Sequence, residues 1–303
     1  YISHDLAVVA QLADRIAGMR HGAIVEAGDT RQIMESPQHP YTKLLWSVRK
    51  LETPQREPGE LLLQANNLEV SYGAQRALNH VSIDIERGAV VALVGESGSG
   101  KTTLGRLLAG FLPKATGDIE FEGQSLAADL KERRPEMARR IQYVYQSADT
   151  ALNPRHTIRK IIARPLTFFH GIRGEALEAK TRELLEQVNL PVSLLGKYPF
   201  ELSGGQRQRV AIARAIAGEP ELLICDEVTS ALDQVVQVEI LSLLKRLRDE
   251  RGLTCLFITH DIDTVRAIAD KVVVMHRGSI VEMGSRSDVL DNPDAEYTRE
   301  LLS

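Results

Sequence analysis

The sequence is poor in cysteine, in aromatic residues and in long apolar stretches. Its 303 residues include two cysteines and one tryptophan, and aromatic residues make up 5%. Cys225 and Cys255 each lie inside an apolar run, so we interpret them as core residues rather than as a disulfide or as ligands of zinc or iron–sulfur. No uncharged apolar run approaches the roughly 18 residues that a membrane-spanning helix needs.

A strong excess of either charge is also missing. The net charge is −4 and 26% of the residues are charged, so composition gives no indication of nucleic-acid or anionic-membrane binding. The densest charged segment, residues 128–140, is interpreted as a solvated helix broken near Pro135. A nucleic-acid patch is the less favoured alternative there, because no aromatic residues interleave with the arginines.

A glycine-rich loop is the most informative feature that is present. Residues 90–94 are apolar and β-branched, residues 102–109 have helical spacing, and the pattern G-x-x-x-x-G-K-T runs from Gly95 to Thr102 between them. Glycines let consecutive backbone amides face phosphate oxygens, and the helix N-terminus adds partial positive charge. Lys101 would reach the β- and γ-phosphates, and the Thr102 hydroxyl would bind Mg²⁺. A purely structural turn is disfavoured because every fixed position is present.

A second apolar run, residues 222–225, ends in Asp226 and Glu227. Asp226 is placed to hold Mg²⁺ through water, and Glu227 to act on a water that attacks the γ-phosphate. Asp226 follows Lys101 by 125 residues, which predicts an inserted unit of domain size. The helical pattern of residues 157–217 fits that insert.

Within the insert, residues 202–206 read L-S-G-G-Q and precede a strong helix at 207–217. Ser203 can cap this helix, and Gly204 and Gly205 would let backbone amides approach an anion. Taken alone, the segment is equally consistent with an ordinary helix-start loop.

The sequence also contains a repeat. Residues 1–47 align without gaps to residues 257–303 at an offset of 256. The recurring positions include His4, Asp5, Asp14, Met19, Gly22, Ile24, Val25, Glu26, Gly28, Pro37, Tyr41 and Thr42. Two unrelated strand–turn–strand segments would not stay in register over such a length. We therefore expect the N-terminal residues to be the end of a first copy.

The remaining pattern sets the expected organisation. Alternating runs at 62–70, 81–85 and 117–123 predict a small antiparallel sheet, and apolar runs at 141–145, 222–225 and 253–258 predict parallel strands. A helix is expected at 234–248 and a hairpin at 271–283, with Ser285 capping a last short helix. Residues 51–60 contain two prolines and three glutamates and are expected to be a linker. The predicted units are 1–50, the linker, and 61–303, with a helical part at about 150–217.

Together these motifs resemble the nucleotide-binding domain of ATP-binding cassette (ABC) proteins over residues 61–283. The resemblance comprises the Walker A loop (95–102), the Q-loop glutamine Gln146, the signature (202–206), Walker B (222–226), Glu227, the D-loop (230–233) and the switch histidine His260. It implies an α/β P-loop NTPase fold with a RecA-like parallel core, an antiparallel β subdomain and an inserted α-helical subdomain. One departure is Val228, where the family usually has proline.

The resemblance also implies site residues, with ATP as the nucleotide and Mg²⁺ as the metal. Glu227 and His260 would be catalytic, and Thr102, Gln146 and Asp226 would serve the metal. Tyr72 would stack on adenine, although an ordinary strand-end tyrosine is the alternative. The nucleotide-binding set is Tyr72, Gly95, Glu96, Ser97, Gly98, Ser99, Gly100, Lys101, Thr102, Thr103 and Gln146, and the signature set, acting on the ATP of a facing cassette, is Ser203, Gly204, Gly205 and Gln206.

Residues 36–48, SPQHPYTKLLWSV, and 151–155, ALNPR, are similar to segments of importer ATPases of the peptide/nickel uptake group. Some members bind an iron–sulfur cluster through cysteines in this tail, but no cysteine is present here, so none is expected. The second tail, NPDAEYTRELLS, departs from the histidine-proline version.

The resemblance implies an ATPase that energises an importer of peptides or related small solutes at the cytoplasmic face of the membrane. Its partners would be permease subunits, a solute-binding protein, and the other cassette of the same full-length chain or a second copy, with no nucleic acid. The alternative is a soluble ABC-type ATPase acting on ribosomes or DNA. The short linker and the lack of a coiled-coil insertion or zinc cysteines disfavour it.

The repeat gives a further expectation. His4 would be the switch histidine of a first cassette, so the native chain should carry a signature about 57 residues before His4 and a second glycine loop about 160 before it. Residues 1–50 have apolar faces around Ile16, Ile24 and Leu44, and we expect them to lack a core of their own. They should therefore be poorly anchored or dock on residues 61–303.

Overall fold

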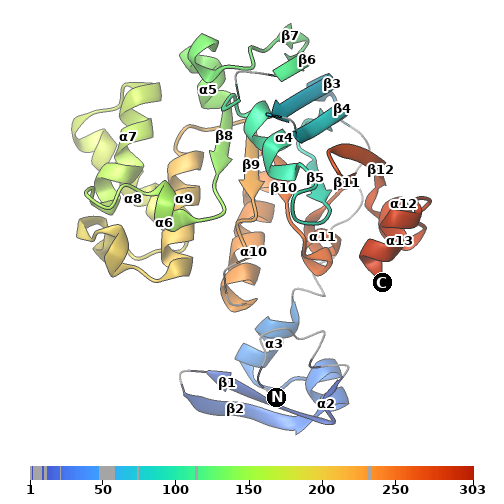
Figure 1. The fold of residues 1–303 in the computed structure, drawn as a ribbon. Helices are drawn as coiled ribbons and strands as arrows, with labels where there is room; N and C mark the ends of the chain where they lie inside the picture. Colours follow the sequence, from blue (N-terminus) through green and yellow to red (C-terminus); the bar gives the residue numbers. More distant parts are fainter. Residues whose placement is uncertain are drawn as a thin grey trace.

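The computed structural model describes residues 2, 9, 12–20, 22–47, 59–73, 75–112, 115–230, 232 and 234–303. They form a six-stranded central sheet, a four-stranded antiparallel sheet and a two-stranded hairpin, with helices around them. Figure 1 shows the two larger sheets and their helices as one body, with the N-terminal hairpin below it. The expected α/β fold, with a parallel core, an antiparallel β subdomain and a helical subdomain, is confirmed.

The central sheet has the strand order β12-β11-β5-β10-β9-β8. The strands from β11 to β8 run parallel, and β12 is antiparallel to β11. Every residue of β5, β9 and β10 is buried, because helices and the second sheet cover both faces. The strands are β5 (Val90–Val94), β8 (Ile141–Val144), β9 (Leu222–Asp226), β10 (Thr254–Ile258), β11 (Lys271–His276) and β12 (Ser279–Ser285).

The antiparallel sheet has the order β4-β3-β6-β7. Its strands are β3 (Leu61–Tyr72), β4 (Gln75–Glu86), β6 (Ala115–Phe121) and β7 (Gln124–Ser125). β3 and β4 extend beyond the alternating runs that predicted them, since their pairing continues to the turn at Tyr72 and Gln75.

Helix α4 (Lys101–Leu108) follows the glycine loop and packs against both sheets. Its buried leucines belong to one apolar cluster that also contains residues of the antiparallel sheet and of the central sheet; these are Leu104, Leu107 and Leu108 with Leu63, Ile83, Val91 and Leu93. This packing fixes the start of α4 at the edge of the central sheet.

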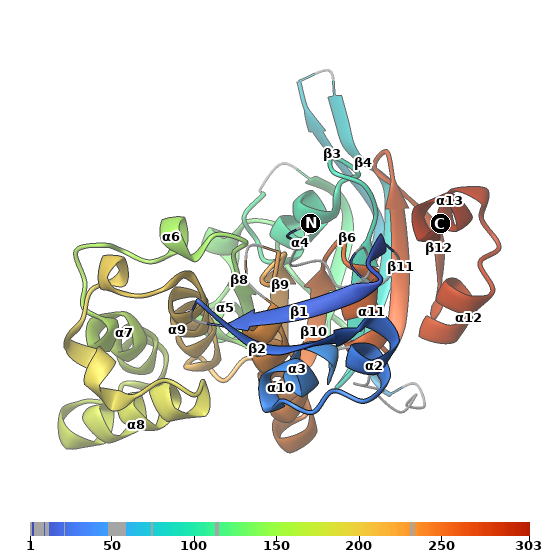
Figure 2. The same ribbon diagram turned by 90° about the horizontal axis from the view of Figure 1, so that it is seen from below.

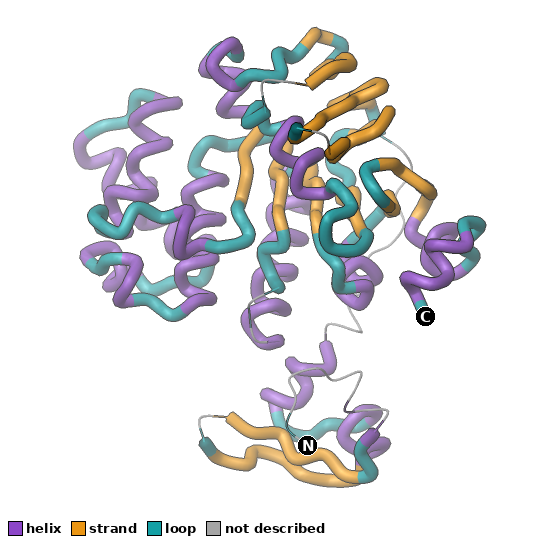
Figure 3. Tube along the Cα trace, in the orientation of Figure 1, coloured by secondary structure: helices purple, strands orange, loops and turns teal. Residues whose placement is uncertain are grey.

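A helical unit lies to one side of the sheets, where Figure 3 shows helices without strands. It contains α6 (Ala148–Ala151), α7 (Ile158–His170), α8 (Gly174–Gln187), α9 (Gly204–Ile216) and two 3-10 helices, Val192–Gly196 and Pro199–Glu201. The helical stretch expected at 157–217 is thus confirmed. The charged segment before it differs from expectation: a 3-10 turn, Leu130–Glu132, is followed by α5 (Pro135–Arg140). Pro135 begins this helix instead of breaking one, because the first helical turn needs no N–H from it.

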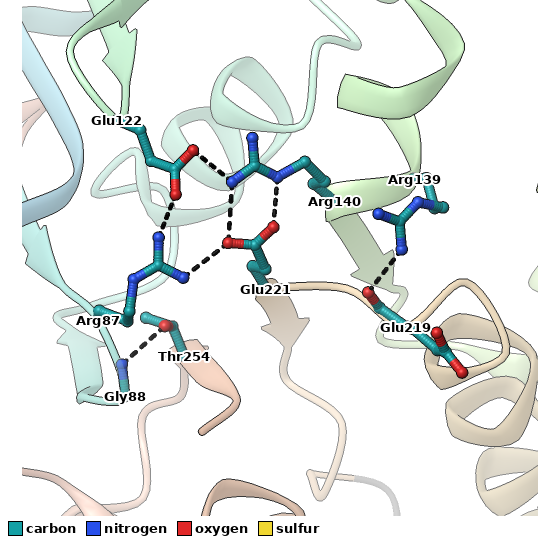
Figure 4. Close-up of polar contacts among 8 residues, drawn as sticks. All are labelled: Arg87, Gly88, Glu122, Arg139, Arg140, Glu219, Glu221 and Thr254. Carbon is teal, nitrogen blue, oxygen red and sulfur yellow. Dashed lines mark hydrogen bonds and ion pairs between the residues drawn. The ribbon is translucent and has the colours of Figure 1, made fainter. Parts of the chain in front are cut away.

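A network of two arginines and two glutamates ties the antiparallel sheet to the central sheet. Arg87 and Arg140 each pair with both Glu122 and Glu221, with an Arg87 Nη1–Glu221 Oε2 distance of 2.7 Å. Figure 4 shows Glu221 at the start of β9 between the two guanidinium groups. Hydrogen bonds from Arg140 and then Arg87 lower the pKa of Glu221 to about 2, despite its partial burial.

The far side of the central sheet is covered by α10 (Gln234–Arg251), α11 (Ile262–Ile268), α12 (Arg286–Asp291) and α13 (Glu296–Leu302). Ser285 accepts a hydrogen bond from the Asp288 amide and caps α12, as expected. Cys225 and Cys255 are buried in this core, which confirms their interpretation as packing residues.

The N-terminal copy consists of β1 (Arg15–Arg20), β2 (Ala23–Asp29), α2 (Thr30–Glu35) and α3 (Pro40–Ser47). Ile16 and Ile33 are 9% and 1% exposed and pack with Val9, Ala13 and Met34. The expectation that this copy lacks a core was therefore wrong, because α2 folds back onto its own hairpin. His4, Asp5, residues 51–58 of the linker and the Leu44 side chain lie outside the described residues.

Helix α3 contacts α10, and both views of the ribbon place them together (Figures 1 and 2). None of the helices described by the structure is both long enough and apolar enough to cross a membrane.

Candidate functional site

The glycine loop joins the end of β5 to the start of α4, and its backbone requires glycine at two positions. Gly95 and Gly100 have φ values of 143° and 105°. A Cβ at Gly95 would lie 2.2 Å from the Met275 carbonyl oxygen, and one at Gly100 would lie 2.6 Å from the Ala77 carbonyl oxygen. The loop therefore packs tightly between β11 and β4, and a larger residue at Gly95 or Gly100 would displace it.

Lys101 points back into the loop. Its Nζ donates to the Gly95 and Glu96 carbonyl oxygens at 2.7 Å each, and to Ser99 Oγ at 3.2 Å. The residue is 5% exposed. Burial lowers the pKa of Lys101, and the nearby carboxylates of Glu227 and Asp226 oppose that shift. A buried ammonium held by neutral carbonyls is a natural partner for an incoming phosphate.

Thr102 and Asp226 meet at the same edge of the central sheet. β10 separates β5 from β9, and its last residue, Ile258, lies opposite Leu93 on one side and Asp226 on the other. The Thr102 Oγ1 donates to Asp226 Oδ1 at 3.0 Å. This pairing across 124 positions of sequence brings together the hydroxyl and the carboxylate that were predicted to serve a metal.

Glu227 follows β9 in a left-handed conformation, with φ of 47°. Its amide donates to the Ile258 carbonyl oxygen at 2.9 Å, which holds the turn in place. Gln146 Nε2 donates to Glu227 Oε2 at 2.6 Å, and His260 Nδ1 lies 3.5 Å from Glu227 Oε1. Non-glycine residues rarely adopt this backbone, and such strain is concentrated at functional sites.

The predicted signature residues lie elsewhere. Ser203 and Gln206 form a reciprocal cap at the start of α9, with Ser203 Oγ accepting from the Gln206 amide at 3.3 Å. Gly205 is buried, and a Cβ there would lie 2.6 Å from the Val236 side chain. Among the hydrogen bonds and ion pairs of the described residues, none joins residues 203–206 to the glycine loop. The expected caps are confirmed, and the two motifs are separate within one chain.

Other predicted residues occupy the margins of the site. Tyr72 is 53% exposed at the end of β3, which leaves its face accessible. Ser230 Oγ donates to the Glu227 carbonyl oxygen at 2.9 Å, whereas Ala231 and Asp233 of the D-loop lie outside the described residues. Val228, the departure from the usual proline, is 2% exposed.

Two tyrosines at the site were not predicted. The Tyr143 hydroxyl donates to Asp226 Oδ2 at 2.6 Å. The Tyr297 hydroxyl, from α13, accepts a hydrogen bond from the Glu96 amide at 3.2 Å, and its ring lies 4.0 Å from that of His276. Neither belongs to a sequence motif of the glycine loop. Only the recurrence of Tyr297 as Tyr41 in the repeat could have signalled it.

The residues present fit a metal that arrives with a nucleotide. Thr102 and Asp226 offer one hydroxyl and one carboxylate, and no group of three or more His, Cys, Asp or Glu residues suited to a metal occurs in the described ranges. Mg²⁺ usually keeps several waters and combines one or two carboxylates with substrate phosphates. Gln146 is bonded to Glu227 here, so its role toward the metal remains a prediction.

A P-loop core with an inserted helical unit, whose last helix, α9, begins within Leu-Ser-Gly-Gly-Gln, has the architecture of an ATP-binding cassette. The chain belongs to the ABC transporter family, since the family model described as "ABC transporter" matches residues 78–230, half of the chain. A second model, "Oligopeptide/dipeptide transporter, C-terminal region", matches residues 25–69.

Several curated relatives are similar over the whole chain. The glutathione import ATP-binding protein GsiA of Shigella flexneri and that of Escherichia coli K12 are each 37% identical over 342 aligned positions, which cover 100% of this chain and 55% of the relative. The chain thus spans about half the length of these relatives.

Solved structures give the same fold. The chain is similar to cbiO1 from Clostridium perfringens, described as part of an ABC transporter complex, with a TM-score of 0.67, 30% identity, and coverage of 77% of this chain and 92% of that one. It is also similar to a dimeric ATP-binding cassette in a post-hydrolysis state bound to ADP and Pi, with a TM-score of 0.67, 30% identity, and coverage of 74% and 99%.

Proposed function

We propose that this chain is the ATP-binding and ATP-hydrolysing part of an ABC importer for peptides or related small solutes. One observation carries the proposal. Thr102 hydrogen-bonds to Asp226, and Gln146 and His260 both contact Glu227. These contacts lie at one edge of the central sheet, beside the buried Lys101. Phosphoryl transfer to water needs this combination of a phosphate cradle, a metal-holding pair and a carboxylate for the water.

Each side chain has a role that follows from its contacts. Lys101 and the glycine-loop amides bind the β- and γ-phosphates, and Lys101 exchanges its carbonyl partners for phosphate oxygens. Thr102 and Asp226 would hold Mg²⁺, which would neutralise charge on the phosphates. Glu227 orients and polarises the attacking water, while Gln146 and His260 fix the carboxylate from two sides.

The signature residues act on the nucleotide of a facing cassette. Ser203 and Gly204 are exposed at the N-terminus of α9, where free amides and the helix dipole favour a phosphate. Because they lie apart from Lys101 within this chain, the phosphate they bind is brought by another cassette. ATP then stabilises the closed pair of cassettes, and loss of the γ-phosphate contact opens it.

The substrate class and the partners rest on similarity. The match to the oligopeptide/dipeptide C-terminal region and the import function named for the GsiA relatives support peptides or related solutes. The partners would be permease subunits and a solute-binding protein, and the chain would act at the cytoplasmic face of the membrane.

The repeat supports a second cassette in the native chain. A segment matched by a model for a C-terminal region, residues 25–69, precedes the start of the ABC match at residue 78. We propose that residues 1–50 end a first cassette, which would face the second within one polypeptide. The sequence of the native locus tests this: a signature about 57 residues before His4 and a glycine loop about 160 before it are expected.

The Glu227→Gln variant tests the catalytic assignment. Loss of a general base typically reduces turnover by about 10²- to 10⁴-fold, while ATP binding should persist because Lys101 and the glycine loop are unchanged. Turnover and ATP affinity are measured in the assembled transporter. Lys101→Ala is the complementary variant, with weakened ATP binding expected. Near-normal hydrolysis by Glu227→Gln would reject the assignment.

A further inference from the structure

The Asp226 carboxylate has a second hydrogen-bond donor besides Thr102. Tyr143 lies in β8, is 6% exposed, and donates its phenolic proton to Asp226 Oδ2 at 2.6 Å. Thr102 donates to the other oxygen, Oδ1, at 3.0 Å. Asp226 itself is 3% exposed. Both oxygens of this buried carboxylate are therefore held by hydroxyl groups from two different elements.

The strand register explains why Tyr143 reaches Asp226. Tyr143 lies opposite Ile224 in the parallel pair of β8 and β9. Ile224 and Asp226 are two residues apart, so their side chains share one face of the sheet with that of Tyr143. The tyrosine ring extends along β9 to the carboxylate, whereas a shorter side chain at this position would stop beside Ile224.

The ring has little freedom to move. The aromatic rings of Phe111 and Tyr145 lie 5.5 and 4.9 Å from it, measured between centroids. Helix α4 packs closely against the ring at Gly105. A Cβ added at Gly105 would lie 3.5 Å from Tyr143 Cε2 and 2.7 Å from the Ile258 side chain. The Tyr143 hydroxyl is thus delivered by a packed ring rather than by a flexible side chain.

We propose that Tyr143 is a positioning residue for the metal-holding carboxylate, an inference that rests on the proposed ATP and Mg²⁺ function. By engaging Oδ2, the phenol fixes the rotation of the Asp226 carboxylate, so that Oδ1 accepts from Thr102 and would serve the metal. Partners of this kind, one shell out from a metal, orient the group that serves it. The same strand leads to Gln146, which holds Glu227, so β8 supports both carboxylates at the end of β9, Asp226 and Glu227.

The Tyr143→Phe variant tests the proposal, because it keeps the ring and removes only the hydroxyl. Mn²⁺ replaces Mg²⁺ as a spectroscopic probe, and its affinity in the presence of ATP is measured by electron paramagnetic resonance. Loss of such a partner typically weakens metal affinity by about 10- to 100-fold. ATP affinity in EDTA should stay within about twofold, because Lys101 and the loop amides bind phosphate without the metal.

Two further variants separate positioning from packing. Tyr145→Phe removes a hydroxyl from the same aromatic cluster without touching Asp226, and Mn²⁺ affinity should remain at the wild-type value. In an Asp226→Asn background, Tyr143→Phe should cause little additional loss, since the two groups act as a unit. Thermal denaturation in EDTA without nucleotide reports the structural effect of each change.

The outcomes are distinguishable. Wild-type Mn²⁺ affinity in Tyr143→Phe overturns the proposal, and so does a loss that Tyr145→Phe reproduces or that comes with an equal loss of ATP affinity in EDTA. If the unaltered chain binds neither ATP nor Mn²⁺ with ATP, the proposed function fails instead, and the Tyr143 inference fails with it.

Discussion

The two copies of the hairpin–helix–helix unit, residues 15–47 and 271–302, have the same local structure in different surroundings. Their hairpins pair in the same register, from Arg15 with Asp29 and from Lys271 with Ser285. Both registers shift at the equivalent step, before Met19 and before Met275. Sequence similarity thus extends to an irregularity of the ladder, which shows that the unit is specified locally.

A carboxylate closes the loop between the two helices in each copy. Glu26 accepts two backbone amides at 2.7 and 3.0 Å, and Glu282 accepts the two equivalent amides at 2.8 and 3.1 Å. The donors are Gln38 and His39 in the first copy, and Asp294 and Ala295 in the second. The Thr42 side chain and then the Gln38 amide lower the pKa of Glu26.

The two copies differ in the strands that pair with their first strand. β11 pairs with β5, and Met275 is 0% exposed. Among the strands that the structure describes, β1 pairs with β2 alone, and Met19 and Ile24 are 62% and 64% exposed. The same hairpin is a core element in one copy and a surface element in the other, so burial is decided by the neighbouring strand.

The largest expected contrast comes from truncating the equivalent methionines. Met275→Ala removes a buried side chain and should cost about 2–5 kcal/mol of unfolding free energy. Met19→Ala, at an exposed position, should change it by less than about 0.5 kcal/mol. Denaturant unfolding of both variants measures the difference. Equal losses would mean that the first copy is buried in solution and would break the comparison.

The hairpin-turn glycines give a smaller contrast. Gly22 and Gly278 have φ values of 80° and 84°, but only Gly278 is crowded, since its Cβ would lie 3.0 Å from the Ala77 carbonyl oxygen. Alanine should cost about 1 kcal/mol at either turn through the left-handed backbone. Gly278→Ala should cost about 1 kcal/mol more through overpacking. Hydrogen exchange of each hairpin measures these losses, and the contact with β4 is refuted if the two are equal.

Lowering the pH should destabilise the cassette through the network of Arg87, Arg140, Glu122 and Glu221. None of these four residues belongs to the first copy. The pKa of Glu221 is about 2 in the folded chain, well below its ordinary value, so its contribution is present above about pH 4.5 and lost as pH falls toward 2. After allowance for solvent screening, we expect Glu221 to contribute about 1 kcal/mol to the free energy of unfolding.

Glu221→Gln should remove that part of the pH dependence, which denaturant unfolding between pH 6 and pH 3 measures. Glu219→Gln is the control, because Arg139 contacts Glu219 at its backbone carbonyl oxygen rather than at its carboxylate. An identical pH profile for the wild type and Glu221→Gln would contradict the role of the network.

The smallest expected effect concerns the equivalent tyrosines. Tyr297→Phe removes the hydroxyl that accepts from the Glu96 amide, and we expect ATP binding to weaken by about two- to fivefold, or about 0.5–1 kcal/mol. Tyr41→Phe lies in the first copy and should leave ATP affinity unchanged. Calorimetry of both variants sharpens the comparison, and an unaltered affinity in Tyr297→Phe would show that α13 does not brace the loop.

The sequence by itself determined the features that depend on neighbours along the chain. The strand at Val90–Val94, the glycine loop, the Ser203 cap and the repeat could all be read from residue type and spacing. Each reflects a local requirement, such as glycine at a positive φ or a hydroxyl at a helix start. The predicted absence of a core in the first copy failed, since the folding of α2 onto its hairpin is not visible in the spacing.

Only the tertiary structure decided which side chains meet. Tyr143 forms a hydrogen bond with Asp226, 83 positions away in the sequence, and Tyr297 forms one with Glu96, 201 positions away. Neither contact produces a periodic pattern in the sequence. Parallel strands are joined through long crossovers, so side chains at one sheet edge come from distant segments. The burial of Met275 and the exposure of Met19 have the same origin. The sequences around the two residues are similar, but β5 pairs with β11, which contains Met275, and not with β1, which contains Met19.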